Sequence, residues 1–95
     1  MFFDIKDGKV YKCTSPTSSR CVYNESDKAI KVLISPDETK AIFLTQKGNV
    51  KLLDVKSSGI RSICGANGPV KDIAWDGPKT VLYKAKNNSF IRWGI

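Results

Sequence analysis

The sequence contains no histidine. A zinc site would therefore have few ligands available, and acid–base catalysis lacks the side chain that most often performs it. The three cysteines, Cys13, Cys21 and Cys64, show no CxxC spacing, so they form no recognisable metal or redox motif. Two interpretations stay open for them. We favour free thiols packed in strands, and the alternative is a disulfide between Cys13 and Cys21 across a hairpin.

Long apolar runs are also missing. Residues 1–6 lack the apolar length of a signal peptide or a membrane span, and we expect a soluble, cytoplasmic protein without a membrane partner. Apolar residues at helical spacing occur only in short runs interrupted by Gly, Pro, Ser or Thr, so no helix is expected. A hydrophobic content of 41% argues against disorder. The 95 residues fit one domain that spans positions 1–95.

Acidic residues are scarce in the second half of the chain. Residues 1–40 carry seven basic and six acidic side chains, whereas residues 41–95 carry nine basic ones and only Asp54, Asp72 and Asp76. The net charge of +7 is therefore concentrated after position 40. A positive field of this kind attracts acidic proteins or nucleic acid. The alternative is that the charge serves solubility alone.

Turn residues recur every 40 positions. The same offset, applied without gaps, superimposes Phe2-Phe3 on Ile42-Phe43, and Leu33 on Ile73. A fixed period of this length is typical of a repeat architecture whose unit is a small sheet. The alternative is a meander of hairpins that have similar lengths. The recurring turns are Asp7-Gly8-Lys9-Val10, Lys47-Gly48-Asn49-Val50 and Asn87-Asn88-Ser89-Phe90.

Between the turn clusters lie segments of β-branched, aromatic and other apolar residues. They predict an all-β fold, an antiparallel meander of hairpin sheets. The continuous apolar runs at 32–34 and 41–44 predict central strands covered on both faces. The polar stretch 14–19 is predicted to be a mobile loop. The expected strands are 2–5, 9–13, 20–23, 29–34, 40–45, 49–55, 60–64, 70–75, 80–85 and 89–93.

The segment 30–54 resembles the tryptophan–aspartate (WD) repeat of β-propellers. An apolar strand ends in Ser35-Pro36-Asp37, a second strand and a glycine turn follow, and a third strand ends in Leu53-Asp54 where the family has Trp-Asp. Trp93-Gly94 stands at that position one period later, and Cys13-Thr14 one period earlier. The Gly-His pair of the family is missing.

The resemblance implies blade-like sheets, in about two and a half repeats of the WD type. Because propellers close with roughly four to eight blades, three outcomes are open. The chain forms a half-ring closed by a second copy, an open β-structure, or a sheet assembly completed by a different protein. We favour the open β-structure.

Side chains that could perform catalysis are few. Cys64, beside Gly65, is the only candidate nucleophile and has no histidine base. The acidic pairs Asp37 with Glu38 and Asp72 with Asp76 fall in turns or at strand ends, where carboxylates cap the backbone. We therefore expect no enzymatic activity, no cofactor and no metal.

Basic and aromatic residues alternate in the second half of the chain. Aromatic and arginine side chains dominate protein–protein hot spots, and the same mixture can stack on single-stranded nucleic acid. The alternative is that the aromatic residues form core and the lysines a solvated face. The predicted partner-binding residues are Lys51, Lys71, Trp75, Tyr83, Lys84, Lys86, Arg92 and Trp93.

These observations favour a non-catalytic protein-binding module. The expected role is a small inhibitor or immunity protein that neutralises a toxin or enzyme by steric occlusion, with its basic half on an acidic or substrate-contacting surface. The second hypothesis is a single-stranded nucleic-acid-binding protein. It ranks lower because no RNP or GXXG motif is present. A self-assembling partial propeller that serves as a scaffold, for example as a homodimer, is the third.

Overall fold

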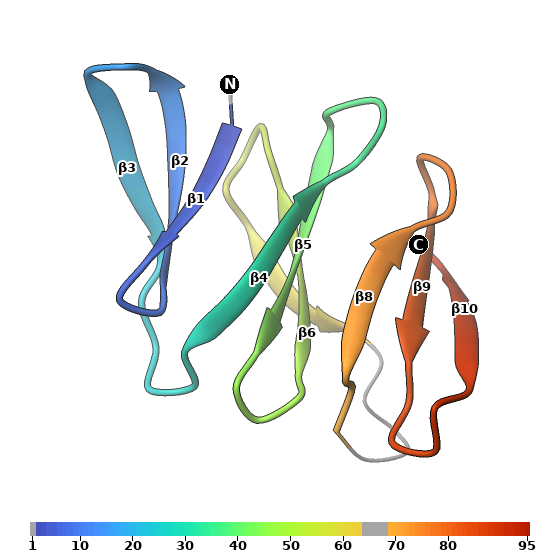
Figure 1. Ribbon diagram of the computed structural model, residues 1–95. Coiled ribbons are helices and arrows are strands. Elements are labelled where there is room, and N and C mark those ends of the chain that lie inside the picture. Colours follow the sequence, from blue (N-terminus) through green and yellow to red (C-terminus); the bar gives the residue numbers. More distant parts are fainter. Residues whose placement is uncertain (1, 64–68) are drawn as a thin grey trace.

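The computed structural model describes residues 2–63 and 69–95. In this part of the chain all regular structure is β-strand, ten strands in total (Figure 1). The strands pair antiparallel with their sequence neighbours and form three separate open sheets. The predicted all-β class is confirmed. The described residues contain no helix long and apolar enough to cross a membrane.

Sheet 1 has the order β1-β2-β3. The prediction of a mobile loop at 14–19 is wrong, because most of this stretch belongs to the β2–β3 hairpin. Ser15 ends β2 and pairs with Ser18 at the start of β3, so only Pro16 and Thr17 lie in the turn. A polar sequence forms a strand here because residues 14–21 are exposed on both faces of the hairpin end, where polar side chains stay solvated while the backbone ladder continues. The strands are β1 (Phe2–Lys6), β2 (Lys9–Ser15) and β3 (Ser18–Tyr23).

Sheet 2 has four strands in the order β4-β5-β6-β7, and sheet 3 has three in the order β10-β9-β8. All ten predicted strands therefore exist in the described residues. The ends of 29–34 and 40–45 match, and the other described ends differ by at most two positions. The strands of sheet 2 are β4 (Ala29–Ile34), β5 (Lys40–Thr45), β6 (Val50–Asp54) and β7 (Ile60–Ile63). Those of sheet 3 are β8 (Asp72–Trp75), β9 (Thr80–Lys84) and β10 (Phe90–Gly94).

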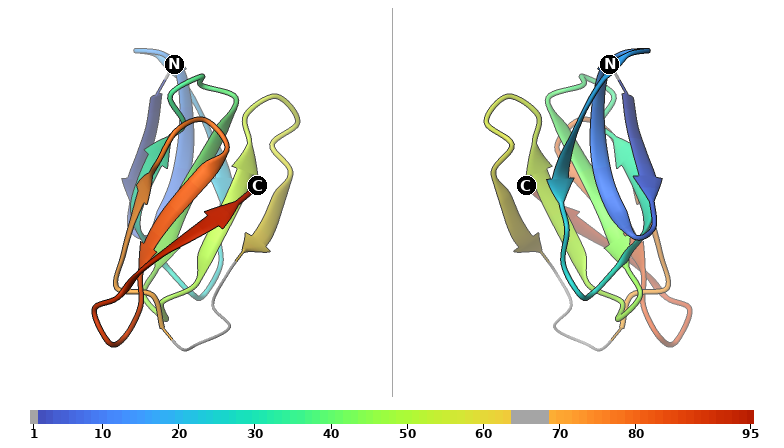
Figure 2. Two further views of the ribbon diagram at one scale, coloured as in Figure 1. Left: turned by 90° about the vertical axis from the view of Figure 1, so that its right-hand side faces the viewer. Right: turned by 90° about the vertical axis from the view of Figure 1, so that its left-hand side faces the viewer.

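The three sheets stand side by side with sheet 2 in the middle (Figures 1 and 2). Successive residues of β5 point to opposite faces, as in any strand. Ala41 and Phe43 join the apolar cluster shared with sheet 1, whereas Ile42 and Leu44 join the cluster shared with sheet 3. Because both faces of β5 are covered, the prediction of a central strand at 41–44 is confirmed. The same prediction for 32–34 is wrong, since these residues lie in β4, which is the edge strand of sheet 2 and is only partly buried there.

Each glycine turn also links one sheet to the next. Gly8 and Gly48 both have positive φ, which favours glycine. The carbonyl of Gly8 accepts a hydrogen bond from the Ala29 amide at 2.9 Å, and that of Gly48 accepts one from the Val70 amide at 2.9 Å. The β1–β2 turn of sheet 1 and the β5–β6 turn of sheet 2 therefore each hold the entry of the chain into the following sheet.

The 40-residue offset holds for some strands and fails for others. Ala41 pairs with Leu53, and Val81 pairs with Trp93, so β5 and β6 match β9 and β10 at this offset. Leu33 pairs with Ile42, however, whereas the equivalent partner of Leu82 is Ala74. The gap-free superposition of Leu33 on Ile73 is therefore wrong by one residue.

A second one-residue shift separates sheet 1 from sheet 2. The β1–β2 turn encloses two residues between Lys6 and Lys9. The β5–β6 turn encloses three, because the Thr45 amide bonds to the Asn49 carbonyl. The superposition of Phe2-Phe3 on Ile42-Phe43 is consequently wrong as well. Phe3, which packs toward sheet 2, is the residue equivalent to Ile42.

Candidate functional site

The predicted contact residues do not form one surface. Lys51 lies on β6 and is separated from the rest: its Nζ donates to Ser62 Oγ at 2.7 Å, and it lines a groove with Val22 of sheet 1. The remaining seven belong to sheet 3 or adjoin it. Lys71 precedes β8 and continues the ladder, because its amide donates to the Lys84 carbonyl at 2.7 Å.

The three predicted aromatic contact residues lie in the core between sheets 2 and 3. Tyr83 is only 8% exposed, and Trp75 and Trp93 pack against the same cluster. Trp75 Nε1 also donates to the Leu33 carbonyl at 3.0 Å. These side chains point toward sheet 2 because they alternate with the outward-facing residues of their strands. They offer a partner little surface.

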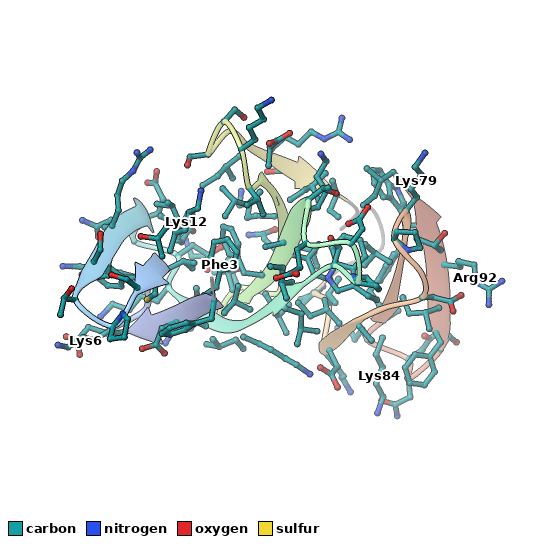
Figure 3. All side chains as sticks on the ribbon, turned by 90° about the horizontal axis from the view of Figure 1, so that it is seen from above. Phe3, Lys6, Lys12, Lys79, Lys84 and Arg92 are labelled. Carbon is teal, nitrogen blue, oxygen red and sulfur yellow. The ribbon has the colours of Figure 1, made fainter. Side chains whose placement is uncertain are left out.

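The outward-facing residues of sheet 3 make a different surface, which we call the outer face. Phe90, absent from the predicted set, is 69% exposed there. Its cross-strand neighbour is Lys84, and Arg92 lies two residues further along β10. Lys86 is exposed in the turn between β9 and β10. Figure 3 shows the ends of Lys84 and Arg92 at the periphery of the molecule.

Two aspartates accompany this face and are already engaged. Arg92 Nε lies 2.9 Å from Asp76 Oδ2, and Lys31 Nζ of sheet 2 lies 2.7 Å from Asp72 Oδ1. The hydrogen bond from Lys31, with a second from the Ile73 amide, lowers the pKa of the Asp72 carboxyl. Residues 69–95 carry five basic and two acidic side chains. The outer face therefore remains positive after these pairs have formed.

No protein-family model matches the chain, and no curated protein matches it. The likeness to WD repeats stays a prediction, because antiparallel sheets occur in many folds.

Neither the thiols nor the carboxylates of the described residues assemble a metal site. Cys13 and Cys21 are free thiols, so the disulfide alternative is wrong. The pairing explains this, because Cys13 lies opposite Ser19, whereas Cys21 lies opposite Tyr11. No group of three potential metal ligands forms within residues 2–63 and 69–95. Cys64 and the segment 65–68 lie outside the described residues.

The carboxylates of two turns cap the backbone, and the sequence predicted this for the first of them, Asp37. Asp37 accepts hydrogen bonds from the Ser35 hydroxyl and from the amide and hydroxyl of Thr39. These bonds lower the pKa of its carboxyl, and the Ser35 hydroxyl has the largest effect. Asp54 accepts from the amides of Lys56 and Ser57. The Ser57 amide is foremost in lowering the pKa of Asp54. Both groups stabilise turns of sheet 2.

Asp27 joins the segment between sheets 1 and 2 to the β5–β6 turn. Its carboxylate accepts hydrogen bonds from Thr45 Oγ1 at 2.7 Å, Asn49 Nδ2 at 2.8 Å and the Lys47 amide at 3.0 Å. The residue also lines a groove of about 510 Å³ that Tyr23 shares. Because both carboxylate oxygens accept hydrogen bonds from the β5–β6 turn, we assign Asp27 a structural role.

Stability is expected to fall in acid through Asp27. Partial burial opposes ionisation, but the hydrogen bonds from Thr45, Asn49 and Lys47 outweigh it and lower the pKa of this carboxyl. A carboxyl whose pKa is lower in the folded chain stabilises the fold above its unfolded-state pKa of about 4 and loses this contribution as pH falls further. Urea unfolding at a series of pH values gives the free energy of unfolding as a function of pH. The acid limb of this curve, its fall below the unfolded-state pKa, should be less steep for Asp27→Asn than for the unmodified chain.

The neighbouring acid supplies the control for this experiment. Glu25→Gln removes a carboxylate at an exposed position two residues earlier and should leave the acid limb as steep as in the unmodified chain. Equal slopes for Asp27→Asn and the unmodified chain would contradict the structural role of Asp27.

Proposed function

We propose that this chain is a non-catalytic protein-binding module whose outer face on sheet 3 docks on an acidic surface of another protein. The observation that carries the proposal is the exposed Phe90 ring beside Lys84 and Arg92. An aromatic anchor within a charged rim is the composition of interface hot spots. A ring left this exposed loses unfavourable contact with water when a partner covers it.

The role we propose is that of a small inhibitor or immunity protein acting by steric occlusion. A face built on three hydrogen-bonded strands changes shape little on binding, which limits the entropic cost of docking. The positive charge of residues 69–95 suits a target, such as a toxin or enzyme, that exposes acidic groups at or near its substrate-contacting surface. Occlusion requires no cofactor and no catalytic group of this chain.

The outer face does not support the scaffold alternative. By the 40-residue offset, Lys84 and Arg92 stand where sheet 2 has Leu44 and Leu52. Those two leucines are buried against sheet 3. A further sheet of the same kind would bury charges in their place, at a cost. Charged outer faces are typical of the terminal units of a repeat stack.

Phe90→Ala is expected to weaken binding of the partner by roughly 30-fold, the effect of losing one hot-spot residue. Lys84→Glu should also weaken it, because it reverses a charge beside the ring. Proteins captured by the immobilised chain from an extract of its source are identified by mass spectrometry. Their affinities are then measured by calorimetry for each variant.

Phe2→Ala is the matched control, since Phe2 is 53% exposed but belongs to sheet 1. Its affinity for the partner should stay within about two-fold of the unmodified chain, as is usual for a residue outside the contact. If every captured protein binds the Phe90→Ala and Lys84→Glu variants as well as it binds the unmodified chain, the outer face is not the docking site.

Single-stranded nucleic acid is the second candidate partner. The same exposed ring beside lysines favours it, because bases stack on aromatic side chains while cations neutralise phosphates. A salt titration with a thymidine oligomer separates the two candidates. Phosphate binding weakens log-linearly with salt, with a slope of about −0.7 per neutralised phosphate of a single strand. Absence of binding at low salt would exclude this candidate.

A further inference from the structure

Sheet 3 lacks the strand that completes sheet 2. In sheet 2, β6 pairs on one side with β5 and on the other with β7. The strand equivalent to β6 in sheet 3 is β10, which pairs with β9 alone among the described residues. In the left-hand view of Figure 2, β7 extends sheet 2 beyond the edge formed by β10. An open strand position therefore lies beside β10.

The backbone of β10 points hydrogen-bonding groups toward this open position. The Ala85 amide bonds to the Ser89 carbonyl, and the Ile95 amide bonds to the Lys79 carbonyl. Since bonded pairs alternate along an antiparallel ladder, residues 91 and 93 also bond to β9. The amides and carbonyls of Phe90, Arg92 and Gly94 then face away from β9. They constitute the free edge of sheet 3.

Sheet 2 shows what such an edge binds in this molecule. Val50, Leu52 and Asp54 of β6 are the equivalents of the three edge residues, and they face β7. The Asp54 amide donates to the Gly59 carbonyl at 2.9 Å. Further along the same ladder, Val50 pairs with Ile63. A fourth strand on sheet 3 would follow the same pattern and place an apolar side chain beside Phe90.

The surroundings of the free edge are positively charged. Arg92 lies on the edge itself and is paired with Asp76 at 2.9 Å. The exposed Lys86 has no acidic residue near it in the sequence, since none follows Asp76. Arg61 is exposed on β7 and shares the face of Ile63, which belongs to the cluster between sheets 2 and 3. A strand placed beside β10 would therefore stack against Arg61. Glutamate and aspartate are the side chains that this position favours.

We propose that β10 accepts an extended acidic segment of the partner protein as a fourth, antiparallel strand. This inference rests on the proposed function, since the segment belongs to the protein that docks on the outer face. Main-chain hydrogen bonds to Phe90, Arg92 and Gly94 supply affinity, and the flanking charges select acidic sequences. An apolar residue of the segment covers the exposed Phe90 ring.

A second copy of the chain fits this edge poorly in the register that places all three edge residues in the strand pair. If two β10 strands paired about a two-fold axis centred on Arg92, each Arg92 would lie opposite its own copy. Like charges directly opposite each other destabilise a strand pair, and charged residues on an edge protect against such self-pairing. An acidic segment turns the same charge into an attraction.

Amide hydrogen exchange measured by NMR tests the proposal with a short synthetic peptide of alternating valine and glutamate. In the free chain the amides of Phe90, Arg92 and Gly94 should exchange fast, and those of Ile91 and Trp93 slowly. Saturating peptide should slow exchange at Phe90 and Arg92 at least tenfold. The equivalent amides of β6, which are already bonded to β7, serve as the internal control and should not change.

The outcomes separate this proposal from the proposed function. Peptide binding without protection of the Phe90 and Arg92 amides overturns strand addition and leaves docking on the outer face intact. No binding at millimolar peptide also overturns it. Protection that appears without peptide and grows with protein concentration assigns the edge to a second copy instead. The peptide can also protect these amides while Phe90→Ala captures the partner as well as the unmodified chain does. That combination supports the edge site and contradicts the proposed function.

Two substitutions at one position isolate the backbone contribution. Arg92→Gln removes the charge only, whereas Arg92→Pro also removes an amide that faces the free edge and leaves the ladder to β9 intact. The proline variant should bind the peptide at least tenfold more weakly than the glutamine variant. Slow exchange at Ile91 and Trp93 verifies that it folds. Equal affinities of the two variants for the peptide would contradict main-chain pairing. If the proline variant does not fold, the amide exchange of the unmodified chain with peptide decides whether the peptide pairs with β10.

Discussion

Replacing Gly48 with alanine is expected to lower the free energy of unfolding by about 2–5 kcal/mol. Gly48 has a φ of +81°, and a Cβ atom there would lie 2.5 Å from Pro69 Cβ, 2.6 Å from Pro69 Cα and 2.8 Å from the Val70 amide nitrogen. Two of these three atoms are backbone. The turn and the entry to sheet 3 would have to separate, which breaks the hydrogen bond between Gly48 and Val70.

Gly77→Ala is the matched control. Gly77 has a φ of +91°, but an added Cβ would meet nothing within 4 Å. This variant should lose only the cost of a left-handed alanine, about 1–2 kcal/mol. Urea unfolding of both variants gives the difference, which measures the clash between sheets. If Gly48→Ala loses no more stability than Gly77→Ala, the close approach of the β5–β6 turn to Pro69 is wrong.

Phe43→Ala is expected to destabilise the chain by about 3–5 kcal/mol, the range for removing a buried aromatic side chain. Phe43 is fully buried between sheets 1 and 2. Its ring centroid lies 4.6 Å from that of Tyr23 at an interplanar angle of 56°. The substitution leaves a cavity where two sheets meet. Thermal or urea unfolding monitored by tryptophan fluorescence and circular dichroism measures the loss.

The same substitution at an exposed phenylalanine provides the comparison. Phe90→Ala removes an identical side chain from the outer face and should change stability by no more than about 0.5 kcal/mol. The two variants therefore separate two roles. Phe43 should affect folding, and Phe90 should affect partner binding. A large loss of stability in Phe90→Ala would mean that its ring is packed, which would remove the basis for the docking face.

The strands were predictable because their sequence signals are local. The run at 41–44 has apolar residues on both faces of the strand. This pattern is typical of a strand that is covered on both faces. Glycine and asparagine at the turns fix hairpins by their tolerance of positive φ. The structure has positive φ at Gly8, Gly48 and Asn88, at the three turns that the repeat identified. Hairpins that join neighbouring strands then determine the order within each sheet.

The relative register of the sheets was not predictable from the period alone. One residue more or less in a turn shifts a strand and exchanges its two faces. The β5–β6 turn is one residue longer than the β1–β2 turn, which is why Phe3 and not Phe2 matches Ile42. Hydrophobic patterns tolerate such a shift when both residues are apolar, as Phe2 and Phe3 are. The sequence therefore contained no signal that distinguished the two alignments.

The candidate site was predicted in part. Lys84, Lys86 and Arg92 lie on or beside the outer face, as their position after the last acidic residue indicated. Trp75 was assigned to the surface because aromatic and basic residues are neighbours in the sequence, yet its ring packs toward sheet 2. Alternation along β10 places Phe90 and Ile91 on opposite faces, but the pattern does not say which of them meets sheet 2. Only the packing of the sheets decides that.

The side-by-side arrangement of the sheets also has a consequence for how the chain opens. Sheet 2 has two neighbours, whereas sheets 1 and 3 have one each, so less buried surface holds the outer two in place. In linear arrays of this kind the end units detach at lower free energy than the centre. Sheet 3 can therefore fray while sheets 1 and 2 persist, and a ligand that clamps sheet 3 should raise the melting temperature of the whole chain.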